Sequence, residues 1–286
     1  MTMMLKPKPN FDWKEADDPR SKKEQHRPRP ALTRRPTVPV RTVALLGVLA
    51  LLCACYLGPL NQEAATVLAV KRELPVYSVE TDDNVIAISF DASWGGSQTM
   101  EILDILDRYG IKTTFFLVGI WVDKYPELVK EISARGHEIG NHSDSHPKMS
   151  TLSDEKIRTE LSGVSDKIEA LTGKRPTLFR PPYGDYNNKV VTVSRAEGYE
   201  CVQWSVDSLD WKNRGVEDMV KRATTGVQKG DIVLFHNDSQ YITQALPTIL
   251  ESYQQQGFKV IPVGEILLDG PYTIDVQGKQ HPASTK

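Results

Sequence analysis

Residues 85–96 read VIAISFDASWGG. An apolar run, broken by one serine, leads into Asp91, and a Trp-Gly-Gly sequence follows two residues later. A short apolar run that ends near glycines is typical of a strand buried on both faces, as in a parallel sheet. A carboxylate at the end of such a strand is either a turn residue or part of a functional site, where it acts as a base or as a metal ligand.

The same pattern recurs along the rest of the chain. Strand-like runs alternate with helix-like stretches, several of which end in glycine, the usual C-terminal stop of a helix. This alternation predicts βα units around a parallel sheet, either open or closed into a barrel, and seven successive units favour the barrel. No GxGxxG motif follows the first run, which argues against a dinucleotide-binding fold. The strand-like runs are 85–90, 113–118, 137–141, 177–180, 201–206, 231–235 and 258–263.

Polar side chains collect where these predicted strands end. In a parallel barrel the carboxyl ends of the strands share one rim, which is where such folds carry their active sites. One polar residue at a strand end means little, but five strand ends with such residues are hard to assign to chance. We therefore expect one site that contains Asp91, His142, His146, Arg180, Asp210 and His236.

His142 and His146 are four residues apart in HSDSH. Two neutral imidazoles at this spacing can bind one divalent metal ion, usually zinc. A chance pair on a solvated loop is the alternative, but the position after a strand and opposite Asp91 favours a metal site. His137, which precedes that strand, is predicted to be structural.

The sequence Arg180-Pro181-Pro182-Tyr183-Gly184 predicts a stiff turn, because proline fixes φ and glycine permits close backbone approach. It is either simply a tight turn or a functional element. In the second case Arg180 orients a carboxylate through two hydrogen bonds, and a backbone N–H near Tyr183 faces an oxyanion.

His236 ends an apolar strand and is followed by Asn-Asp, which indicates a loop at the rim. Asp210 can pair with it and raise its pKa, so that His236 becomes a proton donor at neutral pH. Three aromatic residues near this rim can stack on sugar faces or can be residues at the edge of the core. They are Trp94, Tyr183 and Trp211.

The beginning of the chain differs from the rest. Residues 1–42 hold 11 Lys/Arg and 5 Asp/Glu, whereas the whole chain of 286 residues has a net charge of −2. The remainder is therefore acidic, which argues against a nucleic-acid partner. Residues 43–60 (VALLGVLALLCACYLGPL) carry no charge, near the minimum length for a transmembrane helix.

A buried helix normally has a polar face, and a cleavable signal peptide normally begins close to the N-terminus, so both alternatives fit residues 43–60 less well than a signal anchor. The Lys/Arg-rich flank predicts a single-pass cell-membrane protein with a cytoplasmic N-terminus. The predicted parts are a disordered basic tail (1–42), the anchor (43–60), a linker (61–82), an extracytoplasmic domain (83–270) and a C-terminal tail (271–286). Cys201 has no partner in the outer part, so no intrachain disulfide is predicted there.

The polar strand ends resemble the polysaccharide deacetylase family, also known as the NodB-homology domain or carbohydrate esterase family 4. The five motifs of that family read approximately TFDDG, HxxxH, RPPYG, DxxDW and LxH, and this chain has SFDAS, HSDSH, RPPYG, DSLDW and LFH in the same order. The resemblance covers residues 83 to about 268. It implies an α/β fold, a distorted (β/α) barrel of about seven strands, that removes N-acetyl groups from chitin-like or peptidoglycan glycans.

The resemblance also implies roles for individual residues. Asp91 corresponds to the general base and His236 to the general acid, while His142 and His146 correspond to ligands of a divalent metal, which is zinc, cobalt, nickel or manganese. The other matched residues hold the base (Arg180), supply the oxyanion N–H (Tyr183), tune the acid (Asp210) and form the wall of the acetyl pocket (Trp211, Leu234). Trp94 is added as a sugar-stacking candidate.

One position departs from the family's pattern. The second aspartate of its first motif, a metal ligand, corresponds to Ala92, which has no donor atom. Asp91 and Asp144 are the candidates for a replacement ligand. The variant SFDASWGG also resembles a subgroup from spore-forming bacteria, with sporulation-associated members.

Three hypotheses therefore remain open. The first is a membrane-anchored, metal-dependent deacetylase of cell-wall glycan. The second is a catalytically impaired glycan-binding or structural wall protein with the same fold. This hypothesis is suggested by Ala92, which replaces the second aspartate of the first motif. The third is another amidase or esterase that uses the same site.

Overall fold

The computed structural model describes residues 72–283. The predicted basic tail (1–42), the predicted anchor (43–60) and the first half of the predicted linker (61–71) lie outside the described residues, so these remain predictions. Within the described part of the chain, no helix is both long enough and apolar enough to cross a membrane.

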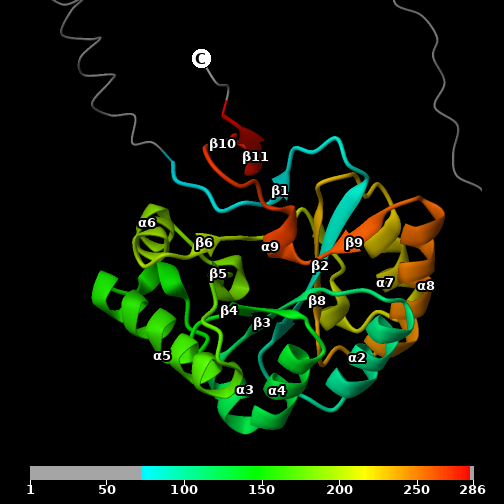
Figure 1. The fold of residues 1–286 in the computed structure, drawn as a ribbon, viewed down its shortest axis with the longest axis horizontal. Coiled ribbons are helices and arrows are strands. Elements are labelled where there is room, and N and C mark those ends of the chain that lie inside the picture. The colour runs from blue at the N-terminus through cyan, green and yellow to red at the C-terminus, as the bar shows by residue number, and fades with distance from the viewer. Residues whose placement is uncertain (1–71, 284–286) are drawn as a thin grey trace, which may run out of the picture. The chain divides into compact units, whose positions relative to one another are not determined.

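The centre of the fold is a parallel sheet surrounded by helices (Figure 1). Its strand order is β6-β5-β4-β3-β2-β8-β7, and β9 pairs with β2. Only four residues separate β6 from β7, so one short segment joins the two ends of the sheet. The strands form the predicted distorted barrel only in part, because no ladder pairs β6 with β7 among the described residues. The strands are β2 (Val85–Ala92), β3 (Thr114–Leu117), β4 (Glu138–Asn141), β5 (Leu178–Phe179), β6 (Glu200–Cys201), β7 (Val206–Asp207), β8 (Ile232–His236) and β9 (Lys259–Ile261).

The helices follow the strands in the alternation that the sequence predicts. The longest, α5, begins after Ser153, whose side chain accepts a hydrogen bond from the backbone N–H of Lys156, and it ends at Gly173 with φ of 71°. The helices are α2 (Thr99–Arg108), α3 (Gly119–Lys124), α4 (Pro126–Ala134), α5 (Asp154–Thr172), α6 (Asn188–Ala196), α7 (Val216–Thr224), α8 (Ile242–Gln255) and α9 (Val263–Ile266).

Strand β2 runs through the centre of the sheet between β3 and β8. Because side chains alternate along a strand, Phe90 and Ala92 share one face with the apolar cluster that the surrounding helices cover. Phe90 stacks there between Phe115 and Phe235. Asp91 lies on the opposite face, inside the barrel, so the strand itself aims the carboxylate at the interior.

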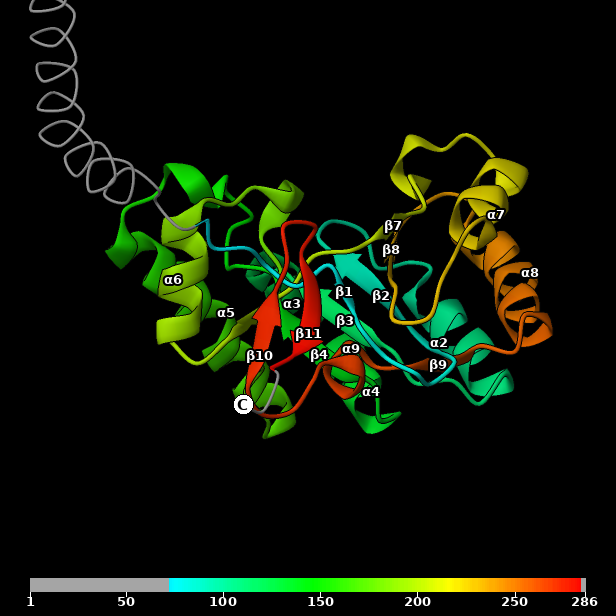
Figure 2. The ribbon, with the colours of Figure 1, turned by 90° about the horizontal axis from the view of Figure 1, so that it is seen from above.

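A second, three-stranded sheet lies at the amino-terminal ends of β2 and β8. It consists of β1 (Ser78–Val79), β11 (Lys279–Pro282) and β10 (Tyr272–Ile274), which lie together in Figure 2. The ordered fold therefore extends beyond the predicted limits of 83 and 270 at both ends. These strands are two to four residues long and mostly polar, so their sequences gave no strand signal.

Candidate active site

A pocket of about 580 Å³ opens at the carboxyl ends of the barrel strands. Arg180 and Asp210, both almost fully buried, lie behind its wall. The pocket brings together the other eight residues that the sequence predicted for the site, which are Asp91, Trp94, His142, His146, Tyr183, Trp211, Leu234 and His236.

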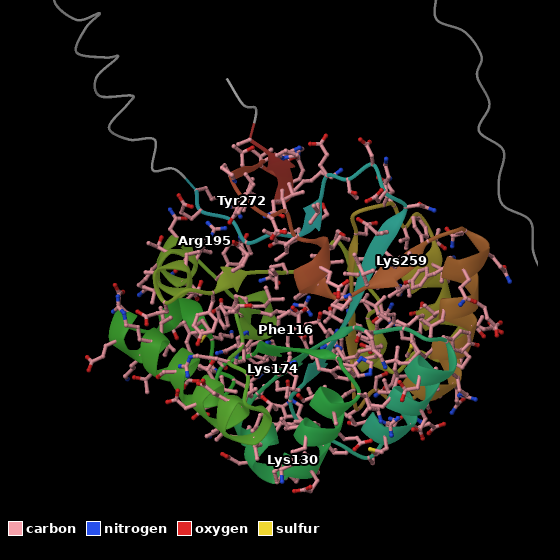
Figure 3. All side chains as sticks on the ribbon, in the orientation of Figure 1. Phe116, Lys130, Lys174, Arg195, Lys259 and Tyr272 are labelled. Atoms are coloured by element: carbon pink, nitrogen blue, oxygen red, sulfur yellow. The ribbon has the colours of Figure 1, made fainter. Side chains whose placement is uncertain are left out.

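Asp91 and Arg180 form a buried ion pair. The Nη1 of Arg180 donates to Oδ1 of Asp91 at 2.8 Å and to Oγ of Ser89 at 2.8 Å, and its Nη2 donates to the carbonyl of Gln203 at 3.0 Å. Its guanidinium lies 4.1 Å from the ring centre of Phe116, labelled in Figure 3. The predicted pair of hydrogen bonds from Arg180 to one carboxylate is therefore wrong: one bond to Asp91 forms, Ser89 and Gln203 accept two further Nη hydrogens, and the buried Nε has no hydrogen-bond partner among the described residues.

The environment of Asp91 favours its charged form. Burial is the largest single effect and would raise the pKa of this carboxyl, but the charge and hydrogen bond of Arg180, together with smaller effects of His142 and His236, hold the pKa below its usual range. Asp91 is therefore ionised at neutral pH, as a general base requires.

His142 presents a lone pair to Asp91. Its Nδ1 lies 2.7 Å from the carbonyl oxygen of Arg180, and since a carbonyl can only accept, Nδ1 carries the hydrogen. Burial lowers the pKa of His142, so the ring is neutral and its Nε2 is an acceptor. This Nε2 faces Oδ2 of Asp91 at 3.4 Å. Two acceptors that face each other at this distance are stabilised by a cation or a proton between them.

His146 is held among aromatic rings. Its ring centre lies 5.1 Å from that of His142, 5.5 Å from that of Trp94 and 4.4 Å from that of Tyr183. Burial lowers its pKa to about 4, so this ring is also neutral. Its Nδ1 is buried and has no hydrogen-bond partner among the described residues. Ser143 accepts the backbone N–H of His146 at 3.0 Å and fixes the loop.

The donor set fits a cation that two imidazoles hold, but not one with three protein ligands. No group of three His, Cys, Asp or Glu side chains suitable for a metal ion occurs within residues 72–283. Ala92 is fully buried and offers only a methyl group. Asp144 is not a replacement, because its Oδ1 pairs with Nζ of Lys167 at 2.7 Å. The buried free nitrogen of His146 and the paired acceptors of His142 and Asp91 are what favour a cation here.

His236 and Asp210 form the second charged pair of the site. Oδ1 of Asp210 lies 2.7 Å from Nδ1 of His236, and Oδ2 accepts the backbone N–H of the same residue at 2.7 Å. Burial by itself would lower the pKa of His236, but the hydrogen bond and charge of Asp210, with smaller effects of Asp91 and Asp238, raise it to about 9. The imidazolium form therefore persists at neutral pH, as a general acid requires.

Replacing Asp210 with asparagine is expected to lower the pKa of His236 from about 9 toward or below 6.5, because burial then acts against a weaker partner. Imidazole NMR signals followed against pH measure this directly. In the native protein the raised pKa means that the pair stabilises the fold fully below about pH 6.5 and loses this effect as the pH rises through about 9. Asp218→Asn, which removes a carboxylate on α7, is the control, and an unchanged titration in Asp210→Asn would contradict the assignment.

The RPPYG turn presents Tyr183 to the pocket. Tyr183 has φ of 60°, an unusual value for a residue with a side chain, and its ring is 64% exposed. The rings of Trp94 and Trp211 are exposed to a similar degree, as a surface for sugar stacking requires. His137 immediately precedes β4, and its Nδ1 accepts the backbone N–H of Thr113, which immediately precedes β3. His137 does not line the pocket, in agreement with its predicted structural role.

Several residues that line the pocket were not assigned to the site from the sequence. Trp204 lies within a predicted strand, and its position in the pocket follows from how the segment between β6 and β7 crosses the barrel. The others are Ser93, Asp207, Asn213, Asp238 and Ser239. Asp207 ends β7, and the other four stand in loops whose shape has no sequence period.

A parallel barrel whose strand ends carry a carboxylate base and an imidazolium acid on adjacent strands defines a hydrolase-type site. The polysaccharide deacetylase family model matches residues 78–202. A peptidoglycan-N-acetylglucosamine deacetylase of Bacillus cereus is 38% identical over 67% of this chain and 92% of its own length. The peptidoglycan-N-acetylmuramic acid deacetylase PdaA of Bacillus subtilis is 31% identical over 68% of this chain and 75% of its own length. The chain belongs to the polysaccharide deacetylase family, a family of hydrolases that act on carbon–nitrogen bonds.

Solved structures of the family include proteins without activity. A pseudoenzyme of carbohydrate esterase family 4 from Bacillus anthracis has a TM-score of 0.66 to this chain at 31% identity, covering 73% of this chain and 72% of its own. A mutant of that protein, with a TM-score of 0.66 at 34% identity over 68% and 71% of the two chains, is described as having restored enzymatic activity. The family therefore contains both deacetylases and a pseudoenzyme.

Proposed function

We propose that this protein is a membrane-anchored, extracytoplasmic deacetylase that hydrolyses N-acetyl groups of cell-wall glycan. Two hydrogen-bonded charged pairs carry the proposal, Asp91–Arg180 and Asp210–His236. Asp91 and His236 lie beside each other on adjacent strands and line the same pocket. The relatives that act on peptidoglycan support a cell-wall glycan as the substrate class. The charge-free run at residues 43–60, which predicts an anchor, supports the location, and the resemblance of SFDASWGG to a subgroup with sporulation-associated members supports a role in sporulation.

The protein's own groups account for the proton transfers of amide hydrolysis. Asp91, ionised and held by Arg180, takes a proton from the attacking water as its oxygen forms a bond to the acetyl carbon. The backbone N–H of Tyr183 donates to the oxyanion. His236 then gives a proton to the nitrogen as the carbon–nitrogen bond breaks, and the products are acetate and the free amino sugar. Asp210 holds the imidazole in place throughout.

A divalent ion would be held by His142 and His146, and when bound it supplies a Lewis acid that lowers the pKa of water and polarises the carbonyl. The structure provides two imidazoles and no third protein ligand within residues 72–283. We propose zinc, with cobalt, nickel and manganese as the other candidates, and a weaker affinity than a three-ligand site would give.

The direct test is acetate release by the full chain in detergent, with N-acetylglucosamine oligomers and with peptidoglycan. We expect acetate to form when zinc, cobalt, nickel or manganese is supplied, and we expect a chelator to stop the reaction until the ion is returned. His142→Ala is the matched variant, because it removes an imidazole from the proposed metal site. No acetate from any glycan with any of these ions would overturn the proposal.

A catalytically impaired glycan-binding or structural wall protein is the second candidate. It is favoured by the missing third ligand and by the pseudoenzyme among the similar structures. This candidate predicts oligosaccharide binding, measured by calorimetry, that neither a chelator nor His146→Ala changes, and it predicts no acetate. Binding that depends on the metal would argue for the first candidate.

A further inference from the structure

The loop that carries Trp94 is bonded to the loop that follows His236. The backbone N–H of Gly95 donates to Oδ2 of Asp238 at 3.0 Å, and Nδ2 of Asn237 donates to the carbonyl of Gly95 at 2.8 Å. We call this set of bonds between residues 93–99 and 237–239 the loop contact. It joins segments that are about 140 residues apart in the sequence.

Further bonds make the loop contact specific. Asn237 is fully buried and its Nδ2 also donates to Oγ1 of Thr99 at 3.0 Å, while Nε2 of Gln98 donates to the carbonyl of Ser239 at 2.7 Å. The indole N–H of Trp121 donates to the carbonyl of Gly95 at 2.8 Å. The short loop is therefore held from two sides.

Gly95 is required by the loop contact. A Cβ atom at this position would lie 2.8 Å from Cβ of Asp238, closer than two carbon atoms approach without displacement. The close approach is what lets the backbone N–H reach the carboxylate. The close contact with Asp238 therefore explains why residue 95 is a glycine.

The two loops carry Trp94 and His236, which line the same pocket and would contact the same substrate. Trp94 is 57% exposed and lines the pocket, and its ring stands edge-on to His146. His236 immediately precedes Asn237 and is the acid of the proposed reaction. The loop contact thus fixes the distance between a flat apolar surface and a proton donor, which is what a sugar with a reacting N-acetyl group requires.

We propose that Asn237 and Asp238 are positioning residues that hold Trp94 as the stacking surface for the sugar ring whose amide nitrogen receives the proton of His236. The inference rests on the proposed function for its substrate, but the loop contact itself does not depend on it. It assigns a role to Asn237, which is fully buried behind the site, and to Asp238, which lines the pocket as well as bonding to the Trp94 loop.

The test compares Asp238→Ala with Asp238→Asn in the full chain. Both remove the same negative charge near His236, but asparagine keeps an oxygen that accepts the N–H of Gly95, so their difference reports the hydrogen bond alone. We expect Asp238→Ala to lose hydrogen-exchange protection at residues 93–98 and to lose about tenfold in kcat/KM on oligosaccharides, mainly through KM. Asp238→Asn should regain most of both.

Two further measurements separate positioning from a general structural role. Hydrolysis of p-nitrophenyl acetate, which has no sugar ring, should be the same in the two variants. Asp207→Ala, which removes another pocket carboxylate that bonds only to the nearby N–H of Leu209, should leave exchange at residues 93–98 unchanged. Equal exchange protection in Asp238→Ala and Asp238→Asn would overturn the proposal, and so would equal oligosaccharide KM values. Absence of acetate in every variant would instead count against the proposed function, since hydrogen exchange is read without turnover.

Discussion

Asp91→Asn is expected to reduce acetate release by roughly a hundred- to ten-thousandfold, the usual range for loss of a general base. An amide oxygen can still accept the hydrogen bond of Arg180, so the geometry of the site is largely kept. What is lost is the negative charge that takes a proton from water. The same substitution is also expected to destabilise the fold, for a separate electrostatic reason.

Two opposite effects on stability decide the size of that change. Arg180 is fully buried and Asp91 is its only carboxylate partner among the described residues, so asparagine leaves a buried charge unpaired. Breaking a buried pair in this way costs about 3–5 kcal/mol. On the other side, Nδ2 of asparagine can donate to Nε2 of His142, now 3.4 Å from Oδ2, which contributes about 0.5–1.5 kcal/mol. The net loss is therefore about 1.5–4.5 kcal/mol.

Urea unfolding of the wild type and of Asp91→Asn measures this difference. Asp123→Asn is the control, because it removes a carboxylate that pairs with Lys167 at the surface, and such exposed pairs contribute about 1 kcal/mol or less. If Asp91→Asn were as stable as the wild type, Asp91 would not be the counter-charge that Arg180 requires. If it kept full activity, another group would have to be the base.

The strand ends of the barrel show how far the sequence alone can predict a site. Asp91, His142 and His236 were predicted because each stands at the end of a strand-like run, and a parallel sheet places the ends of such runs together. The pairing of His236 with Asp210 was predicted on the same grounds, and the structure confirms its geometry at 2.7 Å. These predictions needed only strand periodicity and the residue types.

Other features depend on how loops and side chains pack, which periodicity does not record. The orientation of Arg180, which gives a single bond to Asp91, depends on its bonds to Ser89 and to the carbonyl of Gln203. Asp144 had the right chemistry for a metal ligand, but Lys167, more than twenty residues away in sequence on α5, binds it instead. The position of Asp238 follows from a contact between two loops.

Ala92→Asp is expected to raise the affinity for zinc by about tenfold or more, because a third protein ligand joins two imidazoles. It is also expected to destabilise the metal-free protein. Ala92 is fully buried at the last position of β2, and a charge there without a partner costs several kcal/mol. Zinc should restore stability, by about 2.7 kcal/mol at a hundredfold excess over Kd.

Thermal unfolding with and without zinc, together with acetate release, measures both effects in one set of samples. Ala92→Asn is the matched control, since it buries a polar group of the same size without the charge that makes a strong ligand, and it should lose stability without recovering it in zinc. His146→Ala added to Ala92→Asp should abolish the gain in affinity. If zinc binding and acetate release rise together, the native site is an impaired enzyme. If zinc binding rises while acetate release stays at a high wild-type level, two imidazoles suffice for turnover, and if zinc does not rescue Ala92→Asp at all, the histidines do not form a metal site.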